Sequence, residues 1–342
     1  MFFDLIRVAL GTRDALSREL SVVEWKQLMG QAQRQGVSSI LISALERLPD
    51  NELPPNQLLM QWIGINQMTV GTYSLHCRRA KELTTFFHKA GYHCCLLKGV
   101  GLAQLYPHPE RRQCGDIDLW VNGDRTAILK FLRARYPLDH IFWHHADAKF
   151  FSDVETEIHY HAGWMYNPFC NHQLQKWFDS EINAQMVVSE ELGFAYPTVR
   201  FNAVYALVHL YHHLIEEGIG VRHLIDYFYI VKALPIADRR IVLELLKSFG
   251  LYRLAASVMW VLKDVCGMSS EYLFIEQNVE EGQFLLDEIM RGGNFGRYRK
   301  DNRRRNSFAR WWALLPHYPR EVLWVVPWKI WHKWWRLVNG RS

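Results

Sequence analysis

The spacing of apolar residues changes twice along the chain. Up to residue 90, apolar residues recur every three or four positions, which is the spacing of one face of a helix. Between residues 92 and 162 the apolar runs are short and are separated by glycine, proline and charged residues, as in strands that alternate with short helices. From Phe201 the helical spacing returns. The pattern predicts an α+β fold in which a small mixed-sheet core is embedded in a mostly helical scaffold.

These changes divide the chain into four regions. We expect an N-terminal helical region at residues 1–90, an α/β core at residues 91–200 and a C-terminal helical region at residues 201–310. The remaining residues, 311–342, form a tail rich in tryptophan and basic residues. No internal repeat divides these regions further.

The N-terminal region carries clear helix signals. The opening run MFFDLIRVAL is apolar, but Asp4 and Arg7 interrupt it, so it predicts a first helix rather than a signal peptide. Ser21 and Glu24 have the spacing of a capping box and predict the start of the next helix. No apolar run along the sequence approaches the ~18 residues of a membrane-spanning helix.

Two aspartates lie one residue apart in the strand-like run DIDLWV. Alternate residues of a strand share a face, so Asp116 and Asp118 point one way while Ile117 and Leu119 point into a core. Two carboxylates in a partly dry site repel each other, and a divalent cation that prefers hard oxygen ligands, such as Mg²⁺ or Mn²⁺, relieves the repulsion. The alternative is a solvated pair at a strand edge, which is the commoner case for two such aspartates alone.

A second strand-like run, VETEIHYH, offers a third carboxylate. Glu155, Glu157 and His159 share one face of this predicted strand, and the two glutamates compete for the third ligand position. Three carboxylates can hold the two metal ions that phosphoryl or nucleotidyl transfer uses. Upstream, Lys98 and Gly99 lie between a strand and a helix start, where an ammonium and backbone amides can meet phosphates.

The order of these motifs resembles the polymerase-β-like nucleotidyltransferase superfamily. Within it, the chain is similar to the uncharacterised nucleotidyltransferase family, whose pattern is Lys-Gly, Arg, Asp-Ile-Asp-Leu and then Glu-hydrophobic-His. The matching segments here are LLKGVGLAQLY, Arg112, GDIDLWV and TEIHYH, followed by VHLYHHL, GVRHLIDYFYIV and RGGNFGRYR. The resemblance covers roughly residues 10–310, and it implies a nucleotidyltransferase core within the α+β fold.

The resemblance also implies roles for particular residues. It places metal ligands at Asp116, Asp118 and Glu157, with Glu157 preferred over Glu155 because it matches the Glu-hydrophobic-His motif. It places Lys98, Gly99 and Arg112 near the triphosphate of a bound NTP. The better-studied superfamily members carry Gly-Ser or Gly-Gly where this chain has Lys98-Gly99. In this chain the phosphate would therefore be held by Lys98 or by backbone amides in place of that serine, or no group would take over its role.

Two further polar groups lie on predicted helices. Arg222 and Asp226 are one turn apart, which by spacing alone is a surface ion pair, whereas the resemblance implies that they line the substrate cleft. His209 and His213 are also one turn apart and could share a zinc ion. No glutamate completes an HExxH motif with them or with His212, so a substrate-contact or ligand-orienting role is favoured.

Composition limits the class of partner. Lysine and arginine number 40 against 35 acidic residues, a net charge of +5, which suits anionic small molecules or a membrane surface but gives no strong nucleic-acid signal. The six cysteines form no CxxC pair and are expected to be buried thiols in a reducing, cytoplasmic compartment.

The tail combines a tryptophan stripe with positive charge. A basic run at residues 297–310 precedes it, and Lys329, Lys333 and Arg336 fall away from the stripe. Packing of the stripe against the core is the favoured interpretation, and peripheral contact with the cytoplasmic leaflet of a membrane is the alternative. The stripe consists of Trp324, Trp328, Trp331 and Trp335.

Together these features predict a metal-dependent nucleotidyltransferase that moves a nucleoside monophosphate from an NTP to an acceptor hydroxyl, with two Mg²⁺ or Mn²⁺ ions. The acceptor stays open among a sugar, a lipid-linked saccharide, a small antibiotic, a protein hydroxyl and an RNA end. The competing predictions are a non-catalytic nucleotide-binding or interaction module and a metal-dependent phosphohydrolase built on the histidines.

Overall fold

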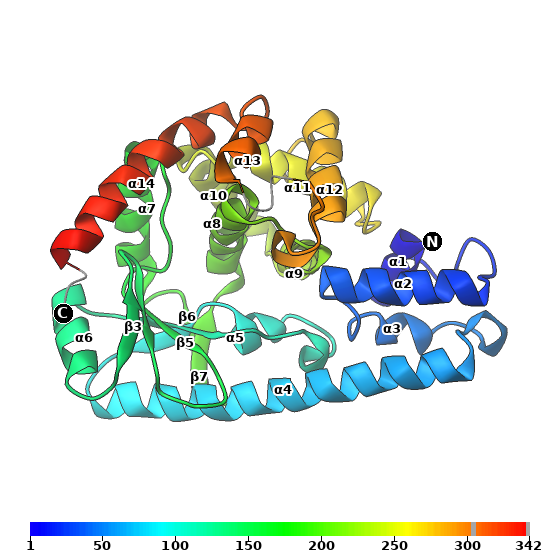
Figure 1. The fold of residues 1–342 in the computed structure, drawn as a ribbon, viewed down its shortest axis with the longest axis horizontal. Helices are drawn as coiled ribbons and strands as arrows, with labels where there is room; N and C mark the ends of the chain where they lie inside the picture. The colour runs from blue at the N-terminus through cyan, green and yellow to red at the C-terminus, as the bar shows by residue number, and fades with distance from the viewer. Residues whose placement is uncertain (302–305, 340–342) are drawn as a thin grey trace.

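The computed structural model describes residues 1–301 and 306–339. Four helices precede the sheet, and the last of them runs along one whole side of the molecule (Figure 1). The second helix begins at the predicted capping box, in which the Ser21 side chain accepts from the Glu24 backbone and the Glu24 carboxylate accepts from the Ser21 backbone. These helices are α1 (Phe2–Leu10), α2 (Val22–Gln35), α3 (Ile42–Leu45) and α4 (Asn56–Lys89).

A five-stranded mixed sheet lies at one end of α4. Its strand order is β1-β2-β5-β4-β3, with β2 and β5 parallel and the other neighbours antiparallel. The parallel pairing puts Asp118 of β2 opposite Glu157 of β5. The strands are β1 (Cys94–Leu96), β2 (Ile117–Val121), β3 (Leu138–Ile141), β4 (His145–Ala148) and β5 (Thr156–His159). Two short helices, α5 (Gly99–Ala103) and α6 (Arg125–Arg133), lie between strands.

β2 is buried on both faces, which excludes the alternative interpretation that its aspartates lie at a solvated strand edge. Leu119 packs into a cluster with residues of α4 and α6, as the alternation predicted. On the opposite face Trp120 stacks on Phe201 with ring centroids 5.5 Å apart and meets Phe178 at 5.9 Å. Asp118 shares that second face and is therefore enclosed between the sheet and the helices that cover it.

The segment between β5 and the C-terminal helices was not predicted by the apolar pattern. It folds as helix α7 (Pro168–Glu181) and a hairpin of β6 (Met186–Ser189) and β7 (Phe194–Pro197). The later helices are α8 (Val199–Glu216), α9 (Val221–Ala233), α10 (Ile236–Ser248), α11 (Tyr252–Asp264), α12 (Val279–Gly292), α13 (Ser307–Leu314) and α14 (Pro319–Asn339).

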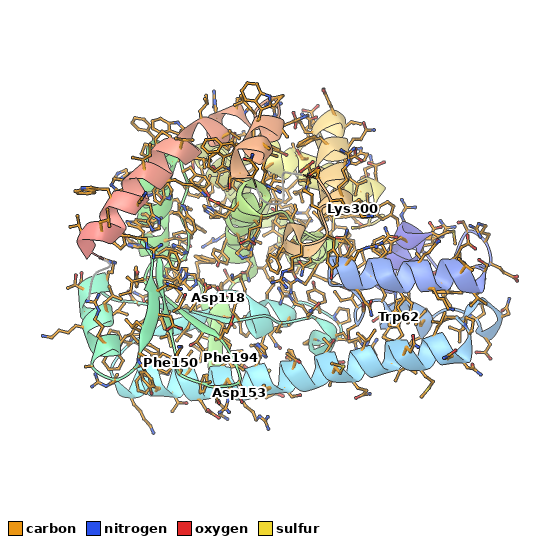
Figure 2. All side chains as sticks on the ribbon, in the orientation of Figure 1. Trp62, Asp118, Phe150, Asp153, Phe194 and Lys300 are labelled. Carbon is orange, nitrogen blue, oxygen red and sulfur yellow. The ribbon has the colours of Figure 1, made fainter. Side chains whose placement is uncertain are left out.

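The helices before and after the sheet share one hydrophobic core. Trp62 of α4 and Leu5 of α1 belong to the same cluster as Phe201 of α8 and Val325 of α14. Figure 2 shows Trp62 among the N-terminal helices and Asp118 nearer the middle of the molecule, with side chains filling the space between. All six cysteines are free thiols, four of them buried, as expected.

The tryptophan stripe of α14 faces the protein. Trp335 is buried, Trp324 and Trp328 are partly buried against the core, and Trp331 is 38% exposed. Trp328 meets Trp143 edge to face with ring centroids 5.7 Å apart. The core-packing interpretation is confirmed for this face. Residues 302–305 of the basic run, and Arg341, lie outside the described residues.

Pro327 lies inside α14. Within residues 1–301 and 306–339, no helix is both long and apolar enough to cross a bilayer.

Candidate active site

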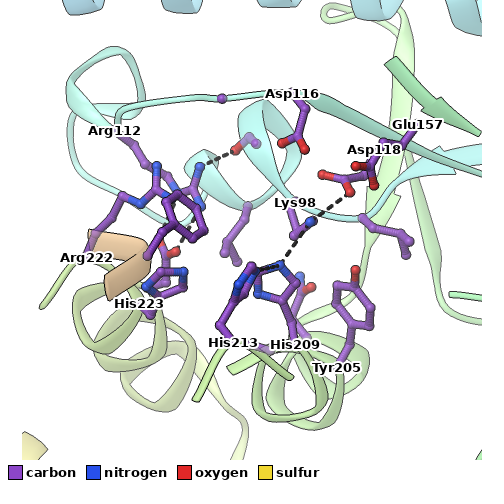
Figure 3. Close-up of a pocket in the computed structure, with 18 residues that line it drawn as sticks. Lys98, Arg112, Asp116, Asp118, Glu157, Tyr205, His209, His213, Arg222 and His223 are labelled. Carbon is purple, nitrogen blue, oxygen red and sulfur yellow. Dashed lines mark hydrogen bonds and ion pairs between the residues drawn. The ribbon is translucent and has the colours of Figure 1, made fainter. Parts of the chain in front are cut away.

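A cavity of about 200 Å³ opens where the end of the sheet meets α8 and α9 (Figure 3). The preferred candidate ligands and nucleotide contacts from the sequence all line it, although they come from five separate parts of the chain. They are Lys98, Gly99, Arg112, Asp116, Asp118, Glu157, Arg222 and Asp226. Glu155, the competing glutamate, is exposed before β5 and does not line this cavity.

Asp118 is the most enclosed carboxylate of the cavity, at 3% exposed. Lys98 Nζ lies 2.7 Å from its Oδ1 atom, and the Nε2 atom of His159 lies 3.1 Å from the same oxygen. His159 Nε2 also lies 3.2 Å from Oε2 of Glu157, the cross-strand neighbour of Asp118. Asp116 lies just before β2 and is half-buried. Asp118 and Glu157 thus share the imidazole of His159, and Asp118 also contacts the ammonium of Lys98.

Burial and charge act against each other in this group. Burial alone would raise the pKa of Asp118, but Lys98 and the hydrogen bond from His159 outweigh it and lower that pKa. Burial opposes ionisation of Glu157 too, yet the His159 hydrogen bond and His145 lower its pKa to about 2. Burial would lower the pKa of His159, but the two carboxylates raise it to about 9. At neutral pH the carboxylates are charged and His159 is an imidazolium.

The donor set fits a hard divalent cation. Oδ2 of Asp118 is buried and has no hydrogen-bond partner among the described residues, which is costly for a charged oxygen. One carboxylate oxygen of Asp118 and one of Glu157 lie within 4.8 Å of each other. Carboxylate oxygens are the ligands that Mg²⁺ and Mn²⁺ prefer, and Asp116 offers a further one on the same cavity.

Arg112 and Asp226 form a buried bidentate ion pair. Nε of Arg112 lies 2.7 Å from Oδ1 of Asp226, and Nη2 lies 2.8 Å from Oδ2. Tyr106 donates its hydroxyl to the same carboxylate at 2.5 Å, and Nη1 of Arg112 donates to the Gly99 carbonyl oxygen at 3.1 Å. The pair therefore holds the loop that carries Lys98 and Gly99 against α9.

The interpretation of Arg222 and Asp226 as a surface ion pair is wrong. Both side chains are buried, Asp226 pairs with Arg112 instead, and Arg222 donates to the Gln113 carbonyl oxygen at 2.9 Å. Nε of Arg222 is buried without a hydrogen-bond partner among the described residues. Arg222 is therefore a cavity cation with a donor still free for an anion.

Three histidines close the side of the cavity opposite the acidic strands. His209 Nε2 lies 2.9 Å from Lys98 Nζ and 3.0 Å from His213 Nε2. His223 of α9 is the third member, and the sequence analysis missed it because helical spacing relates residues of one helix only. His212 points elsewhere, and its Nε2 contacts the Trp164 carbonyl oxygen. Burial lowers the pKa of His209 and of His223 well below the usual value.

The GGNFG segment covers these histidines. Phe295 has a positive φ of 55° and places its ring 4.9 Å from the His213 ring and 5.7 Å from the His223 ring. Gly296 also has a positive φ, and a Cβ atom there would overlap the Glu217 carbonyl oxygen. The glycine at this position therefore lets two backbone segments approach each other closely.

Comparison with known proteins identifies a family for this chain. A sequence model described as an uncharacterised nucleotidyltransferase matches residues 21–267. No curated protein matches the sequence significantly. Among solved structures, a similar one is the crystal structure of an antigenic nucleotidyltransferase-like protein from Paracoccidioides brasiliensis. The two share 12% sequence identity with a TM-score of 0.36, and the match covers 60% of this chain and 96% of that chain.

Proposed function

This chain belongs to the uncharacterised nucleotidyltransferase family, and from that membership we propose that it transfers a nucleoside monophosphate from an NTP to an acceptor hydroxyl. The observation that carries the proposal is the meeting of Asp118 and Glu157, from two parallel strands, in a cavity that also holds Asp116 and Lys98. This is an acidic site with cations beside it, which suits a triphosphate and its counter-ions.

Each residue of the cavity would have a definite task. Asp116, Asp118 and Glu157 would hold Mg²⁺ or Mn²⁺, which when bound supplies charge neutralisation at the transferred phosphate. Lys98 and Arg222 would bind phosphate oxygens, since Arg222 has an unpaired Nε and Lys98 can exchange one carboxylate contact for a phosphate. His159 would orient Asp118 and Glu157 through the hydrogen bonds described above.

The decisive experiment is turnover with each labelled NTP in the presence of Mg²⁺ or Mn²⁺, with cell extract as the source of acceptor. Pyrophosphate together with a labelled product supports the proposal. Release of inorganic phosphate without transfer of label would instead indicate a phosphohydrolase. Nucleotide binding without any turnover would indicate a non-catalytic nucleotide-binding module on the same fold.

Lys98 gives the first prediction about the nucleotide. We expect Lys98→Ala to weaken NTP affinity by about 10- to 100-fold, because a hydrogen bond from a charged donor contributes about 1.5–3 kcal/mol. Lys98→Arg keeps the charge and should lose less. Equilibrium binding of a non-hydrolysable NTP measures both, with the exposed Lys130→Ala as the matched control. Wild-type affinity in both Lys98 variants would mean that the phosphates lie elsewhere.

We propose in addition that the outward face of α14 contacts an anionic lipid surface at the cytoplasmic leaflet. Opposite the tryptophan stripe, five apolar side chains at helical spacing are exposed to solvent, with Ile330 at 67% and Trp334 at 60%. Lys333 and Arg336 are exposed beside them, so the charge of this face complements an anionic bilayer. The five are Leu323, Val326, Ile330, Trp334 and Leu337. This location would favour a lipid-linked saccharide as acceptor.

Sedimentation with vesicles tests the lipid contact. The wild-type chain should pellet with vesicles that contain phosphatidylserine, less so at high salt, and weakly with phosphatidylcholine alone. The double variant Ile330→Glu/Trp334→Glu should lose about 10-fold or more of this binding, because it places charge on the apolar face. Val188→Glu changes an equally exposed apolar residue of β6 and should bind normally. Equal binding by all three proteins would contradict the proposal.

A further inference from the structure

His209, His213 and His223 bring three ring nitrogens together from two helices. One ligand atom of each lies within 4.8 Å of the others, and the Nε2 atoms of His209 and His213 are 3.0 Å apart. In a tetrahedral zinc site with Zn–N bonds of about 2.0–2.1 Å, neighbouring nitrogens lie about 3.3 Å apart. The pair on α8 therefore already has nearly the spacing that a shared zinc ion needs.

The opposite ring nitrogens of two of these histidines have the partners that usually orient metal ligands. Nδ1 of His213 lies 3.4 Å from the Glu217 carboxylate. Nδ1 of His223 lies 3.3 Å from both the amide nitrogen and the carbonyl oxygen of Gly220, so it accepts from the first in one tautomer and donates to the second in the other. In the tautomer that donates to the oxygen, which metal binding requires, the Nε2 atom carries a lone pair. That Nε2 atom is buried and has no hydrogen-bond partner among the described residues. A carboxylate or a backbone carbonyl behind the imidazole is the usual support of a metal-bound histidine.

Without a cation between them, the Nε2 atoms of His209 and His213 face each other with no proton to share. If His213 donates from Nδ1 to Glu217, its Nε2 atom presents a lone pair to the Nε2 atom of His209. The His209 nitrogen already accepts from the Lys98 ammonium at 2.9 Å, so it cannot donate to His213. Lys98 keeps an ion pair with Asp118 at 2.7 Å and can release His209 without losing its counter-charge. A metal ion bound by the three imidazoles removes the conflict.

We propose that His209, His213 and His223 form a second metal site, with Zn²⁺ as the expected ion and one coordination position open to the cavity. Its neutral nitrogen ligands favour a borderline-soft metal such as Zn²⁺ over Mg²⁺, which prefers the carboxylates of Asp118 and Glu157. Three protein ligands with an open fourth position are the arrangement of catalytic rather than structural zinc. The open position takes an anionic oxygen, from water or from a ligand of the cavity.

Metal content and a Co²⁺ titration test this site without any nucleotide. The full chain is stripped with a chelator and dialysed against Zn²⁺ in excess Mg²⁺, and we expect it to keep about one zinc ion. Co²⁺ added in place of zinc should give the visible d–d bands of a tetrahedral complex. His213→Ala should lower Co²⁺ affinity by more than the roughly 10- to 100-fold that loss of an orienting partner costs, and Glu217→Gln should lower it within that range.

Two controls separate this site from its surroundings. Glu157→Gln should keep the Co²⁺ bands, because its substitution lies in the acidic site and leaves the Lys98–Asp118 ion pair in place, and the exposed His172→Ala should also keep them. Circular dichroism establishes that each variant is folded. Absence of bound zinc in the wild-type chain would overturn the proposal. Loss of the bands in Glu157→Gln, or an unchanged Co²⁺ affinity in His213→Ala, would overturn it equally.

Discussion

Asp118→Asn is expected to abolish metal-dependent nucleotide turnover, with a loss of at least about 100-fold, because removal of a single electrostatic stabiliser of a transition state costs that much or more. Glu157→Gln should act in the same way, since it removes the opposite carboxylate of the same pair. Glu155→Gln is the matched control: it makes the same chemical change two residues away, outside the cavity. Pyrophosphate release at saturating NTP and metal measures all three variants.

The stability of Asp118→Asn distinguishes two views of the acidic site. From the sequence, two adjacent aspartates repel each other, so neutralising one would stabilise the metal-free chain. The structure pairs Asp118 with Lys98 and His159, so the amide leaves Lys98 without its counter-charge and leaves His159 with Glu157 alone. We therefore expect a lower free energy of unfolding without metal. Normal turnover by both Asp118→Asn and Glu157→Gln would show that the active site lies elsewhere.

Breaking the Arg112–Asp226 pair is expected to lower the free energy of unfolding by about 3–5 kcal/mol, because either single substitution leaves a buried charge unpaired. That is a large share of the roughly 5–15 kcal/mol that stabilises a typical domain. Arg112→Met and Asp226→Leu should each show the loss in denaturant unfolding. The double variant should recover part of it, since it leaves no uncompensated charge.

An exposed ion pair provides the comparison for this prediction. Arg79 and Asp153 lie 2.8 Å apart at the surface, and Arg79→Ala should change the free energy of unfolding very little, because solvent screens an exposed ion pair. If the Arg112 and Asp226 variants were no less stable than Arg79→Ala, the pair would not hold the Lys98–Gly99 loop in place. Nucleotide affinity of the surviving folded protein would then show whether Arg112 contacts the triphosphate, as the family resemblance implies.

The amino-acid sequence alone determined the elements whose signals are local. The capping box at Ser21 predicted the start of α2, and the change in apolar spacing predicted the strands and the α+β class. The order Lys-Gly, Arg, Asp-x-Asp, Glu-x-His predicted the family, which the match over residues 21–267 confirmed. Alternation along a strand also put Asp116 and Asp118 on one face, and both line the cavity.

Only the tertiary structure decided which distant residues meet. Spacing alone would pair Asp226 with Arg222, four residues away, but Arg112 reaches it from another part of the chain. His223 joined His209 and His213 because α8 and α9 pack side by side, which no spacing within one helix can reveal. The outward apolar face of α14 was not predicted from the sequence, because this helix has apolar residues on both faces and the tryptophan stripe was the more conspicuous of the two. In each case the sequence supplied the side chain, and the free energy of packing between separate elements selected its partner.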